Sequence, residues 1–345
     1  MGIDAKKYPQ FDLSGLPRGR RNLITDVPGV AVGQVTLTGG SARTGVTAIL
    51  PHGGNLFRDK VPAACHVING FGKSAGLVQV EELGTIEAPL VITNTLSVGT
   101  CLTGLVRYML AGNPEIGATT GTVNGVVMEC NDGSLNEIRA LHVKEEHVAA
   151  AIAAAGPEFE EGAVGAGTGM CCYDMKGGVG SASRAVKLDG GDYTVGALLV
   201  TNFGSTKDFT STEGNIGREL AKKLADLNER DKGSVIIVLA TDAPVSDRQL
   251  KRMCRRAQSG LARTGTITGN GSGDIAVGFS TARTIPHFED KDILPSAPQL
   301  AEDAMEVMFR AVIEAVQESV YSSLLHAKTT VGYTGRVQRS LADLL

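Results

Sequence analysis

A single serine within a glycine-rich segment is the residue of this chain best placed for nucleophilic chemistry. Residues 264–280 read TGTITGNGSGDIAVGFS, so Ser272 stands between two glycines, directly before an apolar run. One interpretation is a hairpin, because Asn-Gly is a strong turn signal and residues 266–269 and 274–280 could form its strands. A phosphate-binding loop is a weaker alternative, because the segment fits neither the dinucleotide fingerprint nor the lysine-containing phosphate loop.

The other interpretation of Ser272 is self-cleavage of the chain. Its hydroxyl can attack the carbonyl of Gly271 through a five-membered ring and convert the peptide bond to an ester, which water then hydrolyses. Glycine leaves that carbonyl unhindered and permits the strained backbone that the shift needs. Ser272 would then carry a free α-amine, which titrates at about pH 8 and can act as the base for its own hydroxyl. This chemistry requires no histidine.

The histidines do not point to a metal hydrolase. There are 6 of them, and none stands in a His-x-x-x-His or similar ligand spacing. A Ser-His-Asp triad stays open, since its members need not be neighbours in sequence, but the chain has no Gly-x-Ser-x-Gly elbow at Ser272. We therefore expect neither a metal nor another cofactor.

Further polar segments are candidates for binding groups. The segment ECNDG at 129–133 is either an Asx-type turn after a strand or an anionic pocket for a substrate ammonium. Asn202, at the end of another apolar run, is either a turn former or a donor to a tetrahedral oxyanion. Two glycine-rich segments, at 165–170 and 176–180, favour close packing between sheets over a site of backbone donors.

Short apolar runs rich in β-branched residues alternate with helical patterns along the chain. Each run is bounded by Gly, Asn or Asp, as buried strands usually are. The predicted strands cover residues 46–50, 90–93, 123–129, 195–202, 234–240 and 274–280.

The predicted helices fall between these runs. They cover residues 144–155, 212–227, 246 to about 260, and a last segment that begins at 296. The third begins at Ser246, where Ser-Asp-Arg-Gln forms a capping box. The fourth begins at Ser296, where Ser-Ala-Pro-Gln repeats that signature and apolar residues follow at helical spacing as far as Ala315.

Strands and helices therefore mix throughout, which makes the fold class α/β or α+β. Several strands are apolar on both faces, so we expect the sheets to be covered on both sides. With 345 residues, 42% of them hydrophobic and 20% charged, the chain can bury a substantial core. Its 44 glycines follow no Gly-X-Y period and indicate tight turns. No long linker interrupts the chain, and we expect one domain over residues 1–345.

Composition excludes several classes of protein. The net charge of −4 gives no reason to expect a nucleic-acid partner. No segment is long and apolar enough to span a membrane, and residues 1–21 carry charges and proline where a signal peptide needs an apolar stretch. The 6 cysteines form no Cys-x-x-Cys pair and are too few for a disulfide scaffold. We expect reduced thiols and a cytoplasmic location.

Nine motifs distributed over nearly the whole chain resemble one family of enzymes. They are TDVPGV at 25–30, NGFGK at 69–73, TNTLSVG at 93–99, ECNDG at 129–133, GAGTGM at 165–170, KGG at 176–178, TNFG at 201–204, ATDAP at 240–244 and NGSGD at 270–274. In this order they are similar to the self-processing N-terminal-serine peptidases that include L-aminopeptidase/D-amidase-esterases and bacterial β-peptidyl aminopeptidases.

The resemblance implies a fold, a cut and roles for named residues. The fold is a four-layer α-β-β-α sandwich of the N-terminal-nucleophile type. Cleavage between Gly271 and Ser272 leaves two associated chains, 1–271 and 272–345. Ser272 matches the family's nucleophile, Asn202 its oxyanion-hole amide, and Glu129 the carboxylate that holds the substrate's amino group. The family also implies a homo-oligomer, commonly a tetramer of the cleaved pair.

The chain departs from the family at the assisting acid. The family uses a serine and a nearby glutamate in the smaller chain, but no Ser-x-Glu follows Ser272 here. The candidates for this role are Glu302 and Asp303, with Glu318 as a further one. The segment between residues 280 and 296 is also short, which would alter the rim of the site.

We therefore predict a self-processing serine aminopeptidase or amidase with Ser272 as its N-terminal nucleophile. Its substrates would be small peptides, amides or esters with a free amino terminus. Two alternatives remain at this point: an acyltransferase that uses the same site, and an uncleaved, non-catalytic oligomeric binding protein that keeps Ser272 inside a hairpin.

Overall fold

Two β-sheets form the centre of the computed structural model, which describes residues 3–4, 6–224, 233–289, 291–293 and 296–345. The smaller sheet has four strands in the order β1 (Ala31–Leu37), β2 (Thr44–Leu50), β5 (Leu90–Asn94) and β6 (Val126–Cys130). Its first two pairings are antiparallel, and β5 runs parallel to β6.

The larger sheet has seven strands. Their order is β15 (Ile285–Pro286), β3 (Asp59–Gly70), β14 (Gly273–Ser280), β13 (Ser234–Thr241), β10 (Gly191–Asn202) and β9 (Gly178–Leu188), and β4 (Thr85–Ile86) also pairs with β3. The neighbours β13 and β14 are parallel, and the other pairings are antiparallel.

Helices and short two-stranded ladders surround the two sheets. The α-helices are α1 (Leu77–Leu83), α2 (Val98–Gly112), α3 (Glu145–Ala153), α4 (Gly217–Ala221), α5 (Asp247–Ala262) and α6 (Met305–His326). Short 3-10 turns are η1 (Pro9–Phe11), η2 (Ile24–Asp26), η3 (Thr95–Ser97), η4 (Ile138–Ala140), η5 (Gly165–Gly167), η6 (Thr206–Asp208) and η7 (Glu302–Ala304). The small ladders pair β7 (Cys171–Cys172) with β8 (Met175–Lys176), β11 (Thr210–Ser211) with β12 (Gly214–Asn215), and β16 (Thr330–Val331) with β17 (Val337–Gln338).

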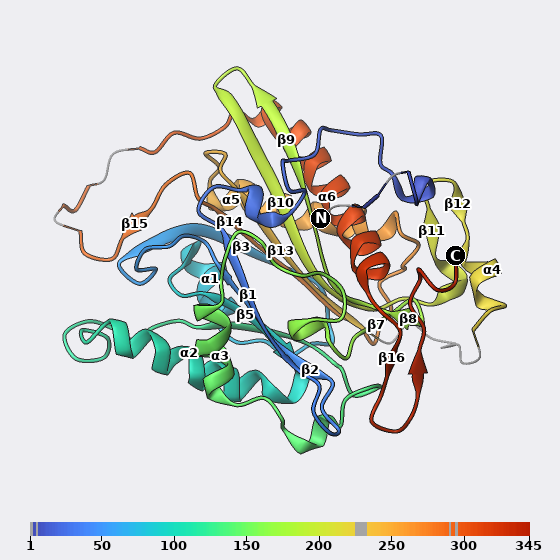
Figure 1. Ribbon diagram of the computed structural model, residues 1–345. Helices are drawn as coiled ribbons and strands as arrows, with labels where there is room; N and C mark the ends of the chain where they lie inside the picture. The colour runs from blue at the N-terminus through green and yellow to red at the C-terminus, as the bar shows by residue number, and fades with distance from the viewer. Residues whose placement is uncertain (1–2, 5, 225–232, 290, 294–295) are drawn as a thin grey trace.

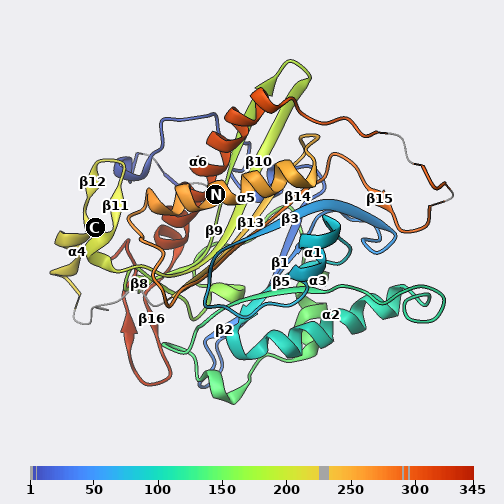
Figure 2. The same cartoon turned by 180° about the vertical axis from the view of Figure 1, so that it is seen from behind.

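The elements stack in four layers. Helices α2 and α3 pack on the smaller sheet, and α5 and α6 pack on the larger sheet. Figure 1 shows these two helical layers on opposite sides of the strands, and Figure 2 shows the same order from behind. The predicted α-β-β-α sandwich is confirmed. In the described part of the chain, no helix is both long enough and apolar enough to cross a membrane.

Strand β13 shows why two faces of one sheet are buried. Its side chains alternate, so that one set joins the core between the two sheets and the other set joins the core beneath α5 and α6. Ile236, Val238 and Ala240 belong to the first set, and Val235, Ile237 and Leu239 belong to the second. A continuous apolar run, here residues 235–240 within a strand that is buried along its whole length, is therefore the expected sequence for this strand.

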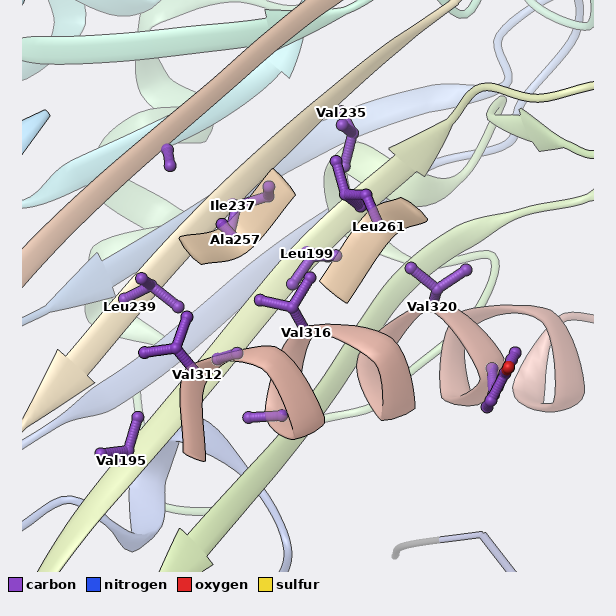
Figure 3. Close-up of a cluster of buried hydrophobic side chains, with 14 of the residues drawn as sticks. Val195, Leu199, Val235, Ile237, Leu239, Ala257, Leu261, Val312, Val316 and Val320 are labelled. Atoms are coloured by element: carbon purple, nitrogen blue, oxygen red, sulfur yellow. The ribbon is translucent and has the colours of Figure 1, made fainter. Parts of the chain in front are cut away.

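The outer face of the larger sheet is covered by a stripe of small apolar side chains on α6. Val312, Val316 and Val320 recur at every fourth position and lie over Val195 and Leu199 of β10 (Figure 3). All five side chains are fully buried. Aliphatic residues thus fill this interface, in a chain where aromatic residues make up only 4% of the sequence.

All six predicted strands are confirmed, within a few residues, as β2, β5, β6, β10, β13 and β14. The predicted helix at 144–155 is α3, and the capping box at Ser246 starts α5, where its hydroxyl accepts from the Gln249 N–H. Long strands β3 and β9 and helix α2 were not predicted from the sequence.

The predicted start of the last helix at Ser296 is wrong, because the helix begins at Met305. Tertiary contacts hold the preceding segment in another conformation. The Leu300 N–H donates to the Pro244 carbonyl (2.9 Å), and the Leu300 carbonyl accepts from the Gln249 side chain (2.8 Å). These bonds replace the intrahelical bonds that a helix starting at 296 would make.

The predicted helix at 212–227 is also largely wrong. Only residues 217–221 are helical, as α4, and residues 225–227 lie outside the described part of the chain. The segment before α4 forms the β11–β12 ladder instead, with Gly214 at φ +118° in its turn. This φ lies in the region that glycine tolerates, so the turn stops a helix from extending towards the N-terminus.

Candidate active site

The polar motifs meet at one end of the two sheets because of the strand directions. Strands β13 and β14 begin at this end, where Ser234 is level with Gly273. Their antiparallel neighbours β10 and β3 end here, with Asn202 and Gly70 at the last paired positions. In the smaller sheet, the parallel strands β5 and β6 end together at Asn94 and Cys130. Residues far apart in sequence thus become neighbours.

A cavity of about 1180 Å³ opens at this end of the sheets. Its walls come from the segments that follow β3, β6 and β10 and from the segment before β14. The residues that line it include Lys73, Thr95, Glu129, Asn131, Cys171, Asp174, Asn202, Gly269, Asn270 and Gly271. The volume is sufficient for a short peptide or another small ligand.

The Gly271–Ser272 peptide bond lies in a turn that is held from outside. The Ser272 N–H donates to the Gly269 carbonyl (2.9 Å) across this turn. The Asn69 amide donates to the carbonyls of Gly269 and Asn270 (3.2 Å each) and also to that of Ser272. Close upstream, Thr268 has φ +54°, a strained conformation for a β-branched residue.

This turn does not close a hairpin, so the hairpin interpretation of residues 266–280 is wrong. Residues 266–269 form no strand, and β14 lies between β13 and β3 rather than beside the segment before it. Strand β14 has partners on both sides, and a hairpin partner would find no free edge. The same arrangement places residue 271 at the wall of the cavity.

The Ser272 hydroxyl is directed at a carboxylate. It donates to Asp274 Oδ1 at 2.6 Å, and the two side chains are only 1% and 2% exposed. Residues i and i+2 of an extended segment point to the same face, which explains why the two side chains meet. The sequence assigned Asp274 to the NGSGD motif and to the start of a strand but gave it no chemical role; its i, i+2 spacing from Ser272 is the signal that could have revealed one.

The glycine after Ser272 is required by close packing of two chain segments. A Cβ atom at Gly273 would lie 2.7 Å from the Cα atom of Gly72. Such a distance is too short for any side chain, so position 273 must stay glycine for the turn to approach the segment after β3. The NGFGK and NGSGD motifs therefore pack directly against each other, with Gly72 next to Gly273.

Glu129 points into the cavity from the end of β6. Its Oε1 accepts from the Lys73 N–H (2.8 Å), and its Oε2 accepts from the Thr95 hydroxyl. The side chain is 3% exposed but lines the cavity. A buried carboxylate with fixed donors on one side and a cavity on the other can bind a ligand cation.

Asn202 is oriented by two backbone groups. Its Oδ1 accepts from the Cys171 N–H (2.9 Å), and its Nδ2 donates to the Asn131 carbonyl (3.0 Å). An amide nitrogen has two hydrogens, so a second N–H remains for a ligand oxygen at the cavity wall. A held amide donor of this type suits stabilisation of an oxyanion.

The three predicted assisting acids lie away from this cavity. Glu302 is exposed at the start of the η7 turn and pairs with Arg248 and Arg252, and its neighbour Asp303 is exposed. Glu318 lies within α6, fully buried. None of the three lines the cavity or contacts Ser272, so their contacts do not support the role inferred from the resemblance.

Glu318 instead belongs to a buried ion cluster. Its oxygens lie 2.5 Å from Arg184 of β9 and 2.9 Å from Arg18, and it also accepts from the Asn22 amide (2.8 Å). Arg184 further contacts Glu314 (3.1 Å). The cluster attaches the N-terminal segment to α6 and β9, which is a structural role.

Lys176 stabilises the segment that precedes Cys171. Its ammonium is fully buried and donates to the carbonyls of Gly167 (3.0 Å), Met170 (2.8 Å) and Gly177 (2.7 Å). Burial lowers the pKa of Lys176 to about 8. These glycine-rich segments, which were expected to pack between sheets, therefore pack around a buried cation.

Asp132 lies three residues beyond Glu129 but turns away from the cavity into the protein. Burial raises the pKa of Asp132 to about 6. The unfolded chain releases this proton near the ordinary value of about 4, so ionisation favours the unfolded state as the pH rises from 4 to 6. Its Oδ2 has no hydrogen-bond partner, while Oδ1 accepts from Asn136 (3.0 Å).

The Asp132→Asn variant should therefore be more stable than the wild type at pH 8, by about 1–2 kcal/mol, and gain nothing at pH 4. The asparagine keeps the bond from Asn136 and removes the buried charge. Denaturant unfolding at the two pH values measures the difference. An equal effect at both pH values would show that Asp132 does not titrate in this way.

No group of three or more potential metal ligands occurs among the described residues. None of the histidines lines the cavity, and the polar side chains at its wall include carboxylates, amides, hydroxyls and the two ammonium groups of Lys73 and Lys207. The four-layer sandwich, with a serine just before a central strand and directly after Gly271 at the wall of the cavity, defines the class of N-terminal-nucleophile hydrolases.

The comparisons with known proteins agree with this class. The model of peptidase family S58 matches residues 22–338. Beta-peptidyl aminopeptidase BapA of Sphingosinicella microcystinivorans is 38% identical over 341 residues, which cover 92% of this chain and 84% of that protein.

Two solved structures are also similar. A protein of Pyrococcus horikoshii OT3 gives a TM-score of 0.93 at 48% identity, with 98% of this chain and 96% of the other covered. The L-aminopeptidase D-Ala-esterase/amidase of Ochrobactrum anthropi, described as a prototype of the serine aminopeptidases with a variant of the Ntn hydrolase fold, gives 0.89 at 33% identity, with 97% and 95% covered.

The chain belongs to peptidase family S58. It is a serine-type aminopeptidase with an N-terminal-nucleophile fold, and the prediction of this family from the nine motifs is confirmed. The comparisons support neither an acyltransferase nor a non-catalytic binding protein.

Proposed function

We propose that Ser272 is the nucleophile and that cleavage of the Gly271–Ser272 bond activates it. The cut leaves chains 1–271 and 272–345. The observation that carries the proposal is the position of this bond: Gly271 lines the same cavity as Glu129 and Asn202, although the three residues come from distant parts of the sequence. Scissile bond, carboxylate and amide thus face one space.

In turnover, the freed α-amine of Ser272 acts as the base. It takes the hydroxyl proton while Oγ attacks the carbonyl that follows the substrate's first residue. The Asn202 Nδ2–H donates to the oxyanion that forms. The leaving amine takes the proton, and water then hydrolyses the acyl-enzyme by the same route.

Glu129 would bind the ammonium group of the substrate. An aminopeptidase substrate always carries this charge near the scissile bond, and a carboxylate held by Lys73 and Thr95 offers a fixed partner. The substrates are therefore small peptides, amides or esters with a free amino terminus. Residues of the β-type belong among the compounds to be tested, because one relative is a β-peptidyl aminopeptidase.

Blocking the substrate's amine tests this proposal on the wild-type enzyme. Small α- and β-amino acid p-nitroanilides should be hydrolysed, and their N-acetyl derivatives should be slower by about 10- to 100-fold, the worth of one charged hydrogen bond. The release of p-nitroaniline measures both rates. Equal rates for the two forms would contradict an aminopeptidase.

The assembled enzyme is proposed to be a homo-oligomer, a tetramer of cleaved pairs, that works in the cytoplasm. All 6 cysteines are free, and only Cys171 among them is not buried, which suits a reducing compartment. Light scattering on the cleaved protein would give its mass in solution, and the mass of a single pair would contradict the tetramer.

A further inference from the structure

The first cleavage of the chain needs a base that turnover does not use. In the unbroken chain, the nitrogen of Ser272 is an amide, and its hydrogen is donated to the Gly269 carbonyl (2.9 Å). An amide nitrogen cannot accept the hydroxyl proton at neutral pH. The α-amine proposed for turnover exists only after the cut, so another group must activate Ser272 before it.

Asp274 occupies the position of that group. Its Oδ1 accepts directly from the Ser272 hydroxyl at 2.6 Å, which is within the range required of a general base. Its side chain is 2% exposed, so water competes little for the carboxylate. Pairing with β13 and β3 fixes the backbone on both sides, with Asp274 level with Val235 and Asn69.

The acids among the cavity-lining residues are Glu129, Asp174 and Asp208, and Asp208 is exposed to solvent. Glu129 accepts from Lys73 and Thr95, and Asp174 accepts from the N–H and the hydroxyl of Thr206 (3.0 and 2.8 Å). Among the cavity-lining residues of the described chain there is no histidine. Asp274 is the titratable residue that the structure places in contact with the Ser272 oxygen.

We propose that Asp274 is the proton acceptor for self-cleavage at Gly271–Ser272. This inference rests on the proposed function, since it assumes a cut at that bond. Asp274 takes the hydroxyl proton as Ser272 Oγ forms a bond to the Gly271 carbonyl carbon. The proton is returned to the Ser272 nitrogen as the C–N bond breaks, which leaves an ester and a free amine. Water then hydrolyses the ester to the Gly271 carboxylate and restores the hydroxyl.

The rate of the first cut in freshly synthesised chains tests this role. Cell-free synthesis followed by a time course on denaturing gels should show wild-type chains dividing in two. The Asp274→Asn chain should divide at least about 100-fold more slowly, the usual contribution of general acid–base catalysis. Asp242→Asn is the matched control. Asp242 lies beyond the end of β13 that is remote from Ser272, and it accepts from the Thr194 N–H (2.6 Å). The Asp242→Asn chain should be cut at the wild-type rate. Cutting of Asp274→Asn at the wild-type rate would overturn the inference.

A thiol at position 272 separates proton transfer from a structural role. A cysteine ionises at about pH 8.5 without help, so it needs a base much less than a serine does. In Ser272→Cys chains at pH 8.5, Asp274→Asn should slow cleavage by less than about 10-fold, against the much larger effect expected in Ser272 chains. The same large loss in both backgrounds would show that Asp274 only shapes the turn. Wild-type chains that never divide at Ser272 would instead contradict the proposed function.

Discussion

The Ser272→Ala chain should migrate as one uncut band and show no measurable hydrolysis of amino acid p-nitroanilides. Alanine lacks the hydroxyl that attacks the Gly271 carbonyl, so neither the cut nor the acyl-enzyme can form. A rate at least about 10⁴-fold below that of the wild type is expected, because nucleophile and base are lost together. A denaturing gel and a p-nitroaniline assay on the same preparation measure the two effects.

Ser280→Ala is the control for this variant. Ser280 ends the strand that Ser272 precedes, and its hydroxyl donates to the Ala243 carbonyl (2.8 Å) far from the cavity. The hydroxyl also accepts from the Ala282 N–H (3.2 Å). We expect this chain to be cut and active, with a loss of about 1–2 kcal/mol in stability from the two missing hydrogen bonds. If Ser272→Ala chains were cut, or if uncut chains kept wild-type activity, Ser272 would not be the nucleophile.

The Glu129→Gln variant should lose activity only on substrates with a free amine. Glutamine keeps the size of the side chain and an oxygen for the Lys73 N–H, but it removes the negative charge that faces the cavity. We expect kcat/KM to fall about 10- to 100-fold for free amino acid amides and esters. For N-acetyl esters, the change should stay below about 3-fold.

Comparison of the two substrate series gives a clear result for Glu129. A loss confined to free amines identifies an ammonium site, since only those substrates carry the charge. Equal losses in the two series would remove Glu129 from ammonium binding and indicate a structural role at the end of β6. Cleavage of the variant chain on a denaturing gel is the necessary control, because an uncut chain would be inactive for another reason.

The candidate site could be located from the sequence because its residues stand at strand ends. Glu129 and Asn202 each close an apolar run, and Ser272 precedes one. Parallel and antiparallel pairing brings such ends together in the folded chain, whereas the sequence grouped these residues only through the resemblance of their motifs. Asp274 was missed because it lies inside the strand pattern, where its side chain was assigned no direction.

The positions of the candidate assisting acids could not be predicted in this way, because they depend on where the last helix begins and on which of its faces is buried. Glu302 and Asp303 were assigned to the last helix because a capping signature at Ser296 predicted that the helix begins there. The hydrogen bonds of Leu300 hold this segment in another conformation, and the helix begins only at Met305. Tertiary hydrogen bonds of this type leave no local signal in the sequence. Nothing in the sequence around Glu318 indicates that its side chain pairs with Arg184 and does not reach the cavity.

Helix α2 shows a similar limit in the fold. It contains several glycines, which lower helix propensity, and the helix was therefore not predicted from the sequence. The structure explains Gly104: a Cβ atom there would lie 2.7 Å from the Glu145 carbonyl at the start of α3. The residue that weakens the helix locally thus permits its close packing on α3, a contact that only the folded chain reveals.

The identity of the residue that begins the small chain is the most direct test of the central claim. The purified wild-type protein should give two bands on a denaturing gel, and N-terminal sequencing of the smaller one should read Ser-Gly-Asp-Ile from Ser272 onwards. A single uncut chain with peptidase activity, or a small chain that begins at another residue, would contradict activation by cleavage at Gly271–Ser272.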